Sequence, residues 1–159
     1  THLKGGVDLI FAEAKLLPLP TSDEVLIGNI SRIRTSEKSI CISDGNALFR
    51  FSRSGEFLGK IEKKGKGPDE YTAISDFVIA DDENVWILPI GKPSLMLYSW
   101  DNRLVKELKT ESTYSSRIYR MGDKLLLHNG NHITDNQANQ YRKLLQVPLC
   151  HAIPQKTNN

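Results

Sequence analysis

The sequence predicts an all-β protein in which about three four-stranded antiparallel sheets follow one another, the third of them incomplete. Three observations lead to this fold class: short apolar segments recur along the chain, turn residues separate them, and long helical periodicity is absent. The best candidate for a helix is residues 7–17. Pro18 and Pro20 would end it, because proline removes a backbone donor and clashes with the preceding turn.

The apolar segments form an internal repeat of roughly 40–50 residues. Aligning Gly55 with Asn102 also aligns the hydrophobic positions on either side. Residues 40–42 align in the same way with residues 85–87 and then with residues 125–127. A repeat of this length, made of short strands and turns, is typical of a β-propeller blade. The alternative is an all-β meander with regularly spaced turns, but the joint match of hydrophobic, turn and glycine positions favours the repeat.

The repeat divides a single domain, residues 1–159, into a lead-in and three predicted blades. The blades cover about residues 27–61, 74–108 and 112–149. The lead-in is residues 1–26, and its residues 14–19 could lend an outer strand to a neighbouring blade. The third blade lacks a fourth strand, because a polar stretch interrupts it and a polar tail follows residues 141–149.

Side-chain alternation in the first predicted blade indicates strands. Ala47, Phe49 and Phe51 fall on one strand face, because successive side chains point to opposite faces. Gly55 follows in a turn, where we expect it to have a structural role through its access to positive φ. Its counterpart Asn102 is the next best residue type for that conformation, so we expect the same left-handed turn in both blades.

Composition is ordinary for a water-exposed globular domain, with 39% hydrophobic and 25% charged residues. The net charge of +2 is too small to indicate binding to nucleic acid or to an acidic membrane surface. No apolar run approaches the roughly 20 residues that a transmembrane helix needs. We therefore expect no nucleic-acid partner and no transmembrane segment.

A longer motif joins the first two predicted blades. It consists of residues 52–61, SRSGEFLGKI, and residues 65–71, GKGPDEY. This motif resembles a signature of the six-bladed β-propeller family common in Bacteroides-type bacteria, which is similar to NHL-repeat and TolB-like propellers. Residues 16–20 and 26–28 also resemble the opening of that family.

The resemblance implies an exported protein, often a lipoprotein, in the periplasm or cell envelope, and most members have no assigned activity. A six-bladed ring needs roughly 250 residues at 40–50 per blade, so this chain would supply the amino-terminal half. The first residue is Thr1 rather than Met. We expect that an upstream segment was removed, either as an export signal or by the choice of chain boundary.

Half of a propeller would leave an apolar sheet face uncovered at each end. Two halves could close on each other as a two-fold homodimer through these exposed blade faces. The alternative is an open fragment. We expect the homodimer, because a soluble protein rarely leaves an apolar face of this size bare.

The glycine- and lysine-rich part of the motif is the first candidate binding site. Lys64 and Lys66 lie beside Gly65 and Gly67, which suggests an anion-binding loop. Phosphate-binding glycines usually stand between a strand and a helix, whereas Pro68 and a further strand follow here. A structural role for the two glycines and the proline, with solvated lysines around them, is the favoured interpretation.

Three further residues are candidates for ligand contact. Glu70 can accept backbone N–H bonds and lock the loop, and Tyr71 can pack its ring while its hydroxyl stays in solvent. Trp100 lies in a predicted turn and is the better of the two tryptophans for an exposed contact. Trp86 aligns with core positions of the other blades.

Metal and cofactor binding are not expected. His128 and His132 are four residues apart, with Asp135 nearby, but they flank a predicted hairpin turn in which His128 would pair with Asn131. No third or fourth ligand is evident. The acidic turn at residues 81–84 could hold calcium, but it lacks the spacing of a calcium loop and is better explained as a solvated hairpin turn.

No nucleophilic site is evident, since the motif Gly-x-Ser-x-Gly is absent. Cys41 is flanked by isoleucines and is typical of a small strand residue. A disulfide with Cys150 is the alternative, which an exported protein would permit.

These observations favour a non-enzymatic binding or scaffold module whose partner is a protein, a peptide or a glycan. The alternative is a propeller lyase or hydrolase with a metal in its central channel. Such an enzyme would need inward-facing His or carboxylate residues from several blades, whereas the two candidate histidines lie in one.

Overall fold

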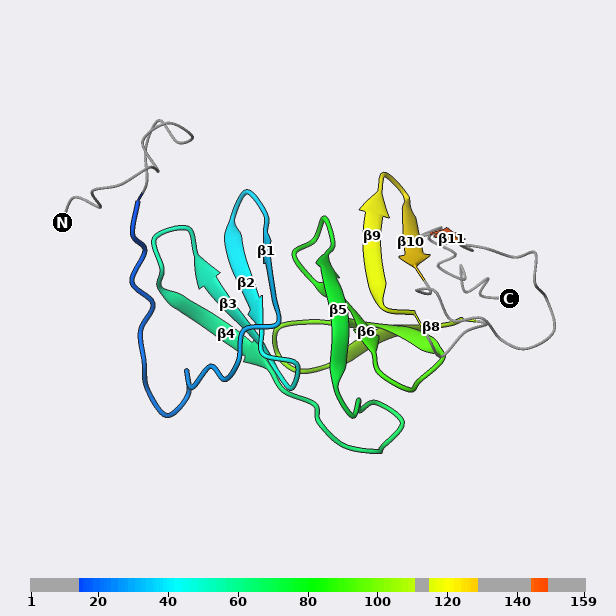
Figure 1. Cartoon of the computed structure of the whole chain (residues 1–159), viewed down its shortest axis with the longest axis horizontal. Coiled ribbons are helices and arrows are strands. Elements are labelled where there is room, and N and C mark those ends of the chain that lie inside the picture. The colour runs from blue at the N-terminus through cyan, green and yellow to red at the C-terminus, as the bar shows by residue number, and fades with distance from the viewer. Residues whose placement is uncertain (1–14, 111–114, 129–143, 149–159) are drawn as a thin grey trace, which may run out of the picture.

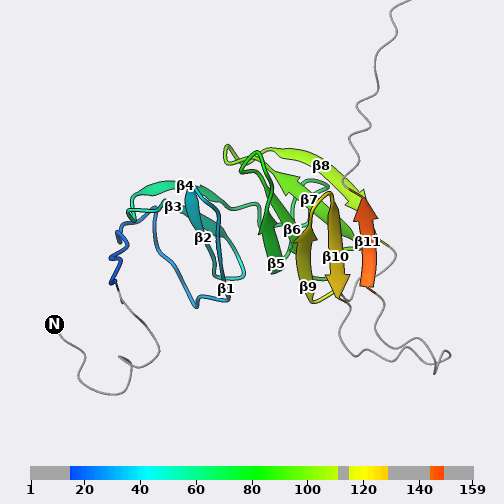
Figure 2. The ribbon, with the colours of Figure 1, turned by 90° about the horizontal axis from the view of Figure 1, so that it is seen from above.

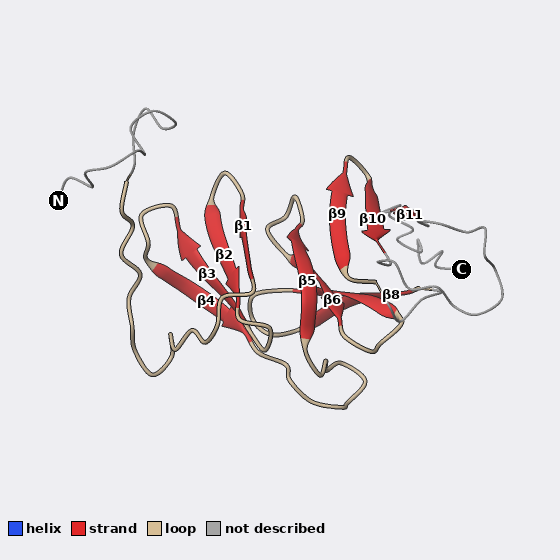
Figure 3. Ribbon diagram, viewed as in Figure 1, coloured by secondary structure: helices blue, strands red, loops and turns tan. Residues whose placement is uncertain are grey.

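The computed structural model describes residues 15–110 and 115–128, and the backbone of residues 144–148. Every regular element in these residues is a β-strand, which confirms the predicted all-β class (Figure 3). The strands form three separate antiparallel sheets, and none of the sheets closes on itself. No helix in the described residues is long and apolar enough to cross a membrane.

The first two sheets have four strands each, and consecutive strands pair as neighbours. The first sheet contains β1 (Arg32–Thr35), β2 (Ser39–Ser43), β3 (Leu48–Ser52) and β4 (Phe57–Ile61). The second sheet contains β5 (Ile74–Ile79), β6 (Val85–Pro89), β7 (Ser94–Tyr98) and β8 (Leu104–Lys109).

The third sheet has three strands in the order β11-β10-β9. These are β9 (Arg117–Met121), β10 (Lys124–His128) and β11 (Leu144–Pro148). His128 pairs with Arg117 on β9 and with Leu144 on β11. The expected pairing of His128 with Asn131 is therefore wrong, because β10 finds its next partner much further along the chain.

The three sheets stand side by side and fan into an open arc (Figures 1 and 2). Figure 2 shows the first strand of each sheet, β1, β5 and β9, along one side of the arc and the outer strands β4 and β8 along the other. Contacts between β1 and β5, and between β5 and β9, join neighbouring sheets along that first side. We call this side, formed by β1, β5 and β9, the inner edge.

Apolar side chains fill the space between neighbouring sheets. Between the first and second sheets lie Cys41, Leu48, Ile61, Phe77, Val85, Ile87, Met96 and Tyr98. Between the second and third sheets lie Val78, Trp86, Leu88, Leu95, Leu97, Ile118, Leu125 and Leu127. Each sheet therefore buries apolar side chains on the face that meets its neighbour, and Trp86 is a core residue as predicted.

A third apolar cluster covers the other face of the first sheet. It contains Ala47, Phe49 and Phe51 from β3 and the turn before it, as the alternation predicted, together with Ile42. Val25 completes the cluster, and Leu19 and Ile27 pack against it.

The lead-in thus takes the place of a neighbouring sheet. Residues 15–26 form no strand, so the described part of the lead-in does not supply the expected outer strand. It packs its apolar side chains on the first sheet instead. The expectation of an uncovered apolar face at the amino-terminal end is therefore wrong, because Phe49 and Phe51 are buried beneath the lead-in.

The left-handed turn predicted for both repeats is confirmed. Gly55 has φ of 94° and Asn102 has φ of 63°. The Asn102 side chain also accepts a hydrogen bond from the Glu62 N–H at 2.9 Å and donates one to the Lys60 carbonyl at 3.0 Å. A Cβ atom at Gly55 would lie 2.8 Å from the Pro18 carbonyl oxygen, so the equivalent turn of the first sheet contacts the lead-in.

Candidate functional site

The GKGPDEY motif forms the connection between β4 and β5, and its backbone closes on itself. The Gly65 N–H donates to the Tyr71 carbonyl at 2.9 Å, and the Tyr71 N–H donates to the Lys63 carbonyl at 2.9 Å. These two bonds form a short parallel bridge between Lys64 and Tyr71. The ends of the loop are thereby held together, and the residues between them are presented at the junction of the first two sheets.

The Glu70 carboxylate fills the inside of this loop. It accepts the Gly67 N–H at 2.7 Å, as predicted for a carboxylate that locks the loop. A Cβ atom at Gly65 would overlap the same carboxylate. A side chain at position 65 would therefore displace the Glu70 carboxylate, whereas the backbone conformation of Gly65 does not itself require glycine.

This arrangement predicts that Gly65→Ala and Glu70→Ala are strongly coupled. Either substitution removes the bond to Gly67, so each should cost about 1–3 kcal/mol in the free energy of unfolding. With the carboxylate already gone, Gly65→Ala should be neutral or stabilise by about 0.4–1 kcal/mol, because alanine restricts the unfolded chain. Urea unfolding of the two single variants and the double variant measures the coupling.

Lys66→Ala, at an exposed position of the same loop, is the matched control and should change stability by less than about 0.5 kcal/mol. Additive costs for the two coupled substitutions would show that Glu70 does not lock the loop.

Tyr71 anchors the loop in the core. It is 1% exposed, and its hydroxyl accepts the Lys63 N–H at 3.3 Å and donates to the Ile61 carbonyl at 3.4 Å. Its ring packs edge-on against Tyr98, whose hydroxyl donates to the Asp69 carbonyl at 2.8 Å. The expectation that the Tyr71 hydroxyl stays in solvent is wrong, because the loop supplies both of its hydrogen-bond partners.

Burial raises the pKa of Tyr71 from 10.0 to about 12 and also raises the pKa of Tyr98. Because the folded state holds the Tyr71 proton more tightly than the unfolded state, its contribution to stability is complete below about pH 10 and is lost between about pH 10 and 12. The Tyr71→Phe variant has no ionisable hydroxyl at this position. Its free energy of unfolding should therefore fall less than that of the parent protein between about pH 10 and 12.

Urea unfolding at about pH 9 and about pH 11 measures the difference. Tyr119→Phe, at a residue that is 47% exposed, is the control and should follow the parent protein. If the Tyr71→Phe variant loses as much stability at high pH as the parent protein, ionisation of Tyr71 is not the cause of that loss.

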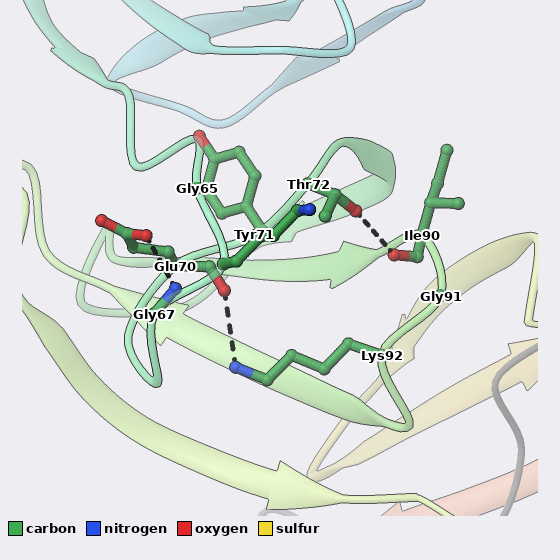
Figure 4. Close-up of a pocket in the computed structure, with 9 residues that line it drawn as sticks. Gly65, Gly67, Glu70, Tyr71, Thr72, Ile90, Gly91 and Lys92 are labelled. Carbon is green, nitrogen blue, oxygen red and sulfur yellow. Dashed lines mark hydrogen bonds between the residues drawn. The ribbon is translucent and has the colours of Figure 1, made fainter.

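A pocket of about 320 Å³ lies between the motif loop and the turn that joins β6 to β7 (Figure 4). Its lining residues are Gly65, Lys66, Gly67, Glu70, Tyr71, Thr72, Ile90, Gly91 and Lys92. The two walls are tied together by hydrogen bonds, so the pocket is preformed.

The ties between the walls come from two side chains. Lys92 Nζ donates to the Pro68 carbonyl at 2.8 Å and to the Glu70 carbonyl at 3.4 Å. Thr72 Oγ1 donates to the Ile90 carbonyl at 3.0 Å. Ile90 itself is 54% exposed, and Lys66 makes no hydrogen bond or ion pair with another described residue. An apolar side chain and an ammonium group are therefore open to a ligand.

The structure brings three of the predicted binding residues together at this pocket, namely Lys66, Glu70 and Tyr71, with Tyr71 as a buried wall. Lys64 points elsewhere, because its Nζ donates to the Asn46 side chain at 2.8 Å. The other wall, residues 90–92, was missed by the sequence reasoning. The sequence signal for this wall was Gly-Lys-Pro at residues 91–93, which is similar to the Gly-Lys-Gly-Pro of residues 65–68.

Trp100 lies away from the pocket and is half-buried between the first two sheets. Its indole N–H donates to the Glu83 carbonyl at 2.7 Å, and the Arg50 guanidinium lies 5.4 Å from the ring centre. Arg50 also pairs with the Glu83 carboxylate at 2.9 Å. The acidic turn at residues 81–84 is thus not simply solvated, because Glu83 connects the second sheet to Arg50 of the first.

No group of three or more His, Cys, Asp or Glu side chains that could hold a metal occurs within the described ranges. His132, Asp135 and Cys150 lie outside those ranges. Cys41 is buried and forms no disulfide with a described residue. Burial raises the pKa of its thiol to about 11, which keeps it protonated and weakly nucleophilic.

Comparison with known families identifies the chain. The model of a domain of unknown function, DUF4934, matches residues 7–147. The chain belongs to the DUF4934 family. The motif predicted a Bacteroides-type family of unknown function, and the matching family is one of unknown function. No curated protein matches this DUF4934 chain.

Among solved structures, the DUF4934 chain is similar to a Bacteroides fragilis crystal structure whose name reads "putative exported protein". The two share 28% sequence identity with a TM-score of 0.66. The match covers 79% of this chain and 36% of the other, so the chain spans about a third of the length of that protein. The expected similarity to an exported Bacteroides protein is supported at this level.

Proposed function

We propose that this DUF4934 chain is a non-enzymatic binding or scaffold module of an exported protein in the periplasm or cell envelope. Its three sheets are consecutive blades of a β-propeller, with the predicted blades at about residues 27–61, 74–108 and 112–149. The side-by-side sheets and the apolar layers between them support this arrangement, and the similarity to a Bacteroides protein supports export.

The pocket between the motif loop and residues 90–92 is the proposed ligand site. One observation carries this proposal: the walls are fixed by internal hydrogen bonds, while Lys66 and Ile90 remain open to solvent. A fixed wall costs little conformational entropy when a ligand binds. An ammonium beside an apolar side chain suits a polar ligand with an apolar face, such as a glycan or an extended peptide.

Isothermal titration of the protein with a panel of oligosaccharides and short extended peptides tests the proposal. Lys66→Ala and Ile90→Ala should each weaken the bound member by roughly tenfold, since each removes a contact worth about 1–2 kcal/mol. Lys38→Ala, an exposed lysine in another turn, should leave binding unchanged. No binding by any member, or binding that neither pocket variant weakens, would contradict the proposal.

Self-association is proposed only for the third sheet, because the lead-in covers the first. Tyr119 and Met121 on β9 are 47% and 54% exposed, and a second copy could cover them in an isologous dimer. Light scattering at micromolar concentration should give a dimer for the parent protein and a monomer for Met121→Glu. Leu58→Glu, at a residue of the first sheet that is 50% exposed, is the matched control. A monomeric parent protein would contradict this proposal.

A further inference from the structure

A charged cluster joins the three sheets at the inner edge, away from the pocket. Its centre is Asp76 of β5, which is 1% exposed. The carboxylate accepts the backbone N–H of Phe77 at 2.9 Å and that of Ile118, on the third sheet, at 3.2 Å. Arg34 of β1 donates to both carboxylate oxygens, at 3.0 and 3.1 Å. One buried carboxylate thus ties all three sheets together.

The hydrogen bonds of Arg34 are directed into the protein. Besides its two bonds to Asp76, Nε donates to the Phe77 carbonyl at 3.2 Å and Nη2 donates to the Ile118 carbonyl at 3.3 Å. The Tyr119 ring centre lies 6.0 Å from the guanidinium carbon. Arg34 therefore neutralises the charge of Asp76 and holds the sheets through its Nε and Nη2 groups.

Arg32, two residues earlier on β1, is a second cation beside the same carboxylate. Its Nε lies 3.5 Å from Asp76 Oδ1, within the range of an ion pair, but the geometry is not that of a hydrogen bond. Nε is buried and has no hydrogen-bond partner, while the whole side chain is 31% exposed. Two guanidinium groups thus face one carboxylate whose oxygens are already occupied, and one positive charge is in excess.

We propose that Arg32 binds an oxyanion, the carboxylate or phosphate group of a small ligand, at the inner edge. The guanidinium is a planar fork whose N–H groups match the two oxygens of such a group. It is partly buried, so the attraction is screened less than at a fully exposed lysine. Arg34 and Asp76 hold the adjacent backbone in place, so the site is preformed. This proposal is independent of the pocket and of its ligand.

The competing explanation is that Arg32 only adds to the pairing of Asp76. The two explanations differ in their measurable consequences, because only a ligand site predicts anion binding that depends on the guanidinium fork. Inorganic phosphate and glucuronate, with glucose as the uncharged control, are suitable probes. The two anions distinguish a phosphate ligand from a carboxylate ligand.

The experiment combines titration calorimetry at low ionic strength with NMR of arginine Nε–H groups. The parent protein should bind at least one of the two anions and not glucose, and the Nε–H signal of Arg32 should move. Arg32→Gln should weaken binding at least about tenfold, because a charge-assisted pair of hydrogen bonds is lost. Arg53→Gln, which removes the same charge at an exposed turn, should change affinity less than about twofold.

Arg32→Lys keeps the positive charge but lacks the planar guanidinium, so it should also weaken anion binding. This second variant tests the proposal even if Arg32→Gln folds poorly. Thermal unfolding of each variant checks its folding. The proposal is overturned if the parent protein binds neither anion, or if Arg53→Gln weakens binding as much as Arg32→Gln does.

Discussion

Asp76→Ala is expected to destabilise the protein by about 3–5 kcal/mol, because it breaks an ion pair whose carboxylate is buried and leaves the partly buried Arg34 without its anion. The substitution removes the acceptor for Arg34 and for the backbone N–H groups of Phe77 and Ile118. The donors that lose Asp76 come from all three sheets, so the loss should loosen the whole inner edge. Urea unfolding followed by tryptophan fluorescence measures the effect.

Asp101→Ala is the matched control for this prediction. Asp101 also pairs with an arginine, Arg103, but both side chains are largely exposed and lie in one turn. Water competes for such a pair, so the substitution should cost no more than about 1 kcal/mol. If Asp76→Ala costs as little as the control, the carboxylate does not tie the sheets together.

The elements of the fold could be predicted from local patterns. The alternation that placed Ala47, Phe49 and Phe51 on one face needs only the period of a strand, and the structure buries all three in one cluster. The positive φ at Gly55 and Asn102 could likewise be predicted, because few residue types accept it. Such features depend on neighbours in the sequence and not on how the sheets pack.

The cluster at Asp76 could not be predicted with the same reasoning, although it left a signal. A single acidic residue interrupts the apolar strand β5, between Ile74 and Ile79. An acidic residue in a buried strand implies a cationic partner. The sequence does not show which cation that is, because Arg34 belongs to a different sheet.

Only one wall of the candidate pocket could be predicted, because the other wall depends on how the sheets pack. The motif loop could be recognised from residues 65–71, including the carboxylate of Glu70 that closes it. The opposite wall, residues 90–92, joins the site only because the second sheet packs beside the loop. Lys92 reaches Pro68 through this packing, and nothing in the local sequence specifies the contact.

The docking of the lead-in gives the second large prediction. Val25 is 3% exposed on the face of the first sheet, next to Leu26, which is 74% exposed. Val25→Asp would place a carboxylate in the apolar cluster that contains Phe49 and Phe51. Burying an unpaired charge costs more than releasing the segment, so the lead-in should detach.

Detachment should lower the free energy of unfolding by about 2–4 kcal/mol, since Val25 and its apolar neighbours lose their burial. The uncovered face of Phe49 and Phe51 should then bind a hydrophobic dye, and the lead-in should be cleaved by protease before the sheets are. Leu26→Asp introduces the same charge one residue later, on an exposed side chain, and should change stability by less than about 0.5 kcal/mol.

Comparing these two neighbouring substitutions distinguishes the loss of lead-in packing from the general effect of an added negative charge. If both variants destabilise equally, the added charge acts generally and the lead-in does not cover the sheet. If neither does, the apolar face of the first sheet is stable without its cover. The expected difference between Val25→Asp and Leu26→Asp would show that a segment without regular secondary structure replaces a neighbouring sheet at this end of the arc.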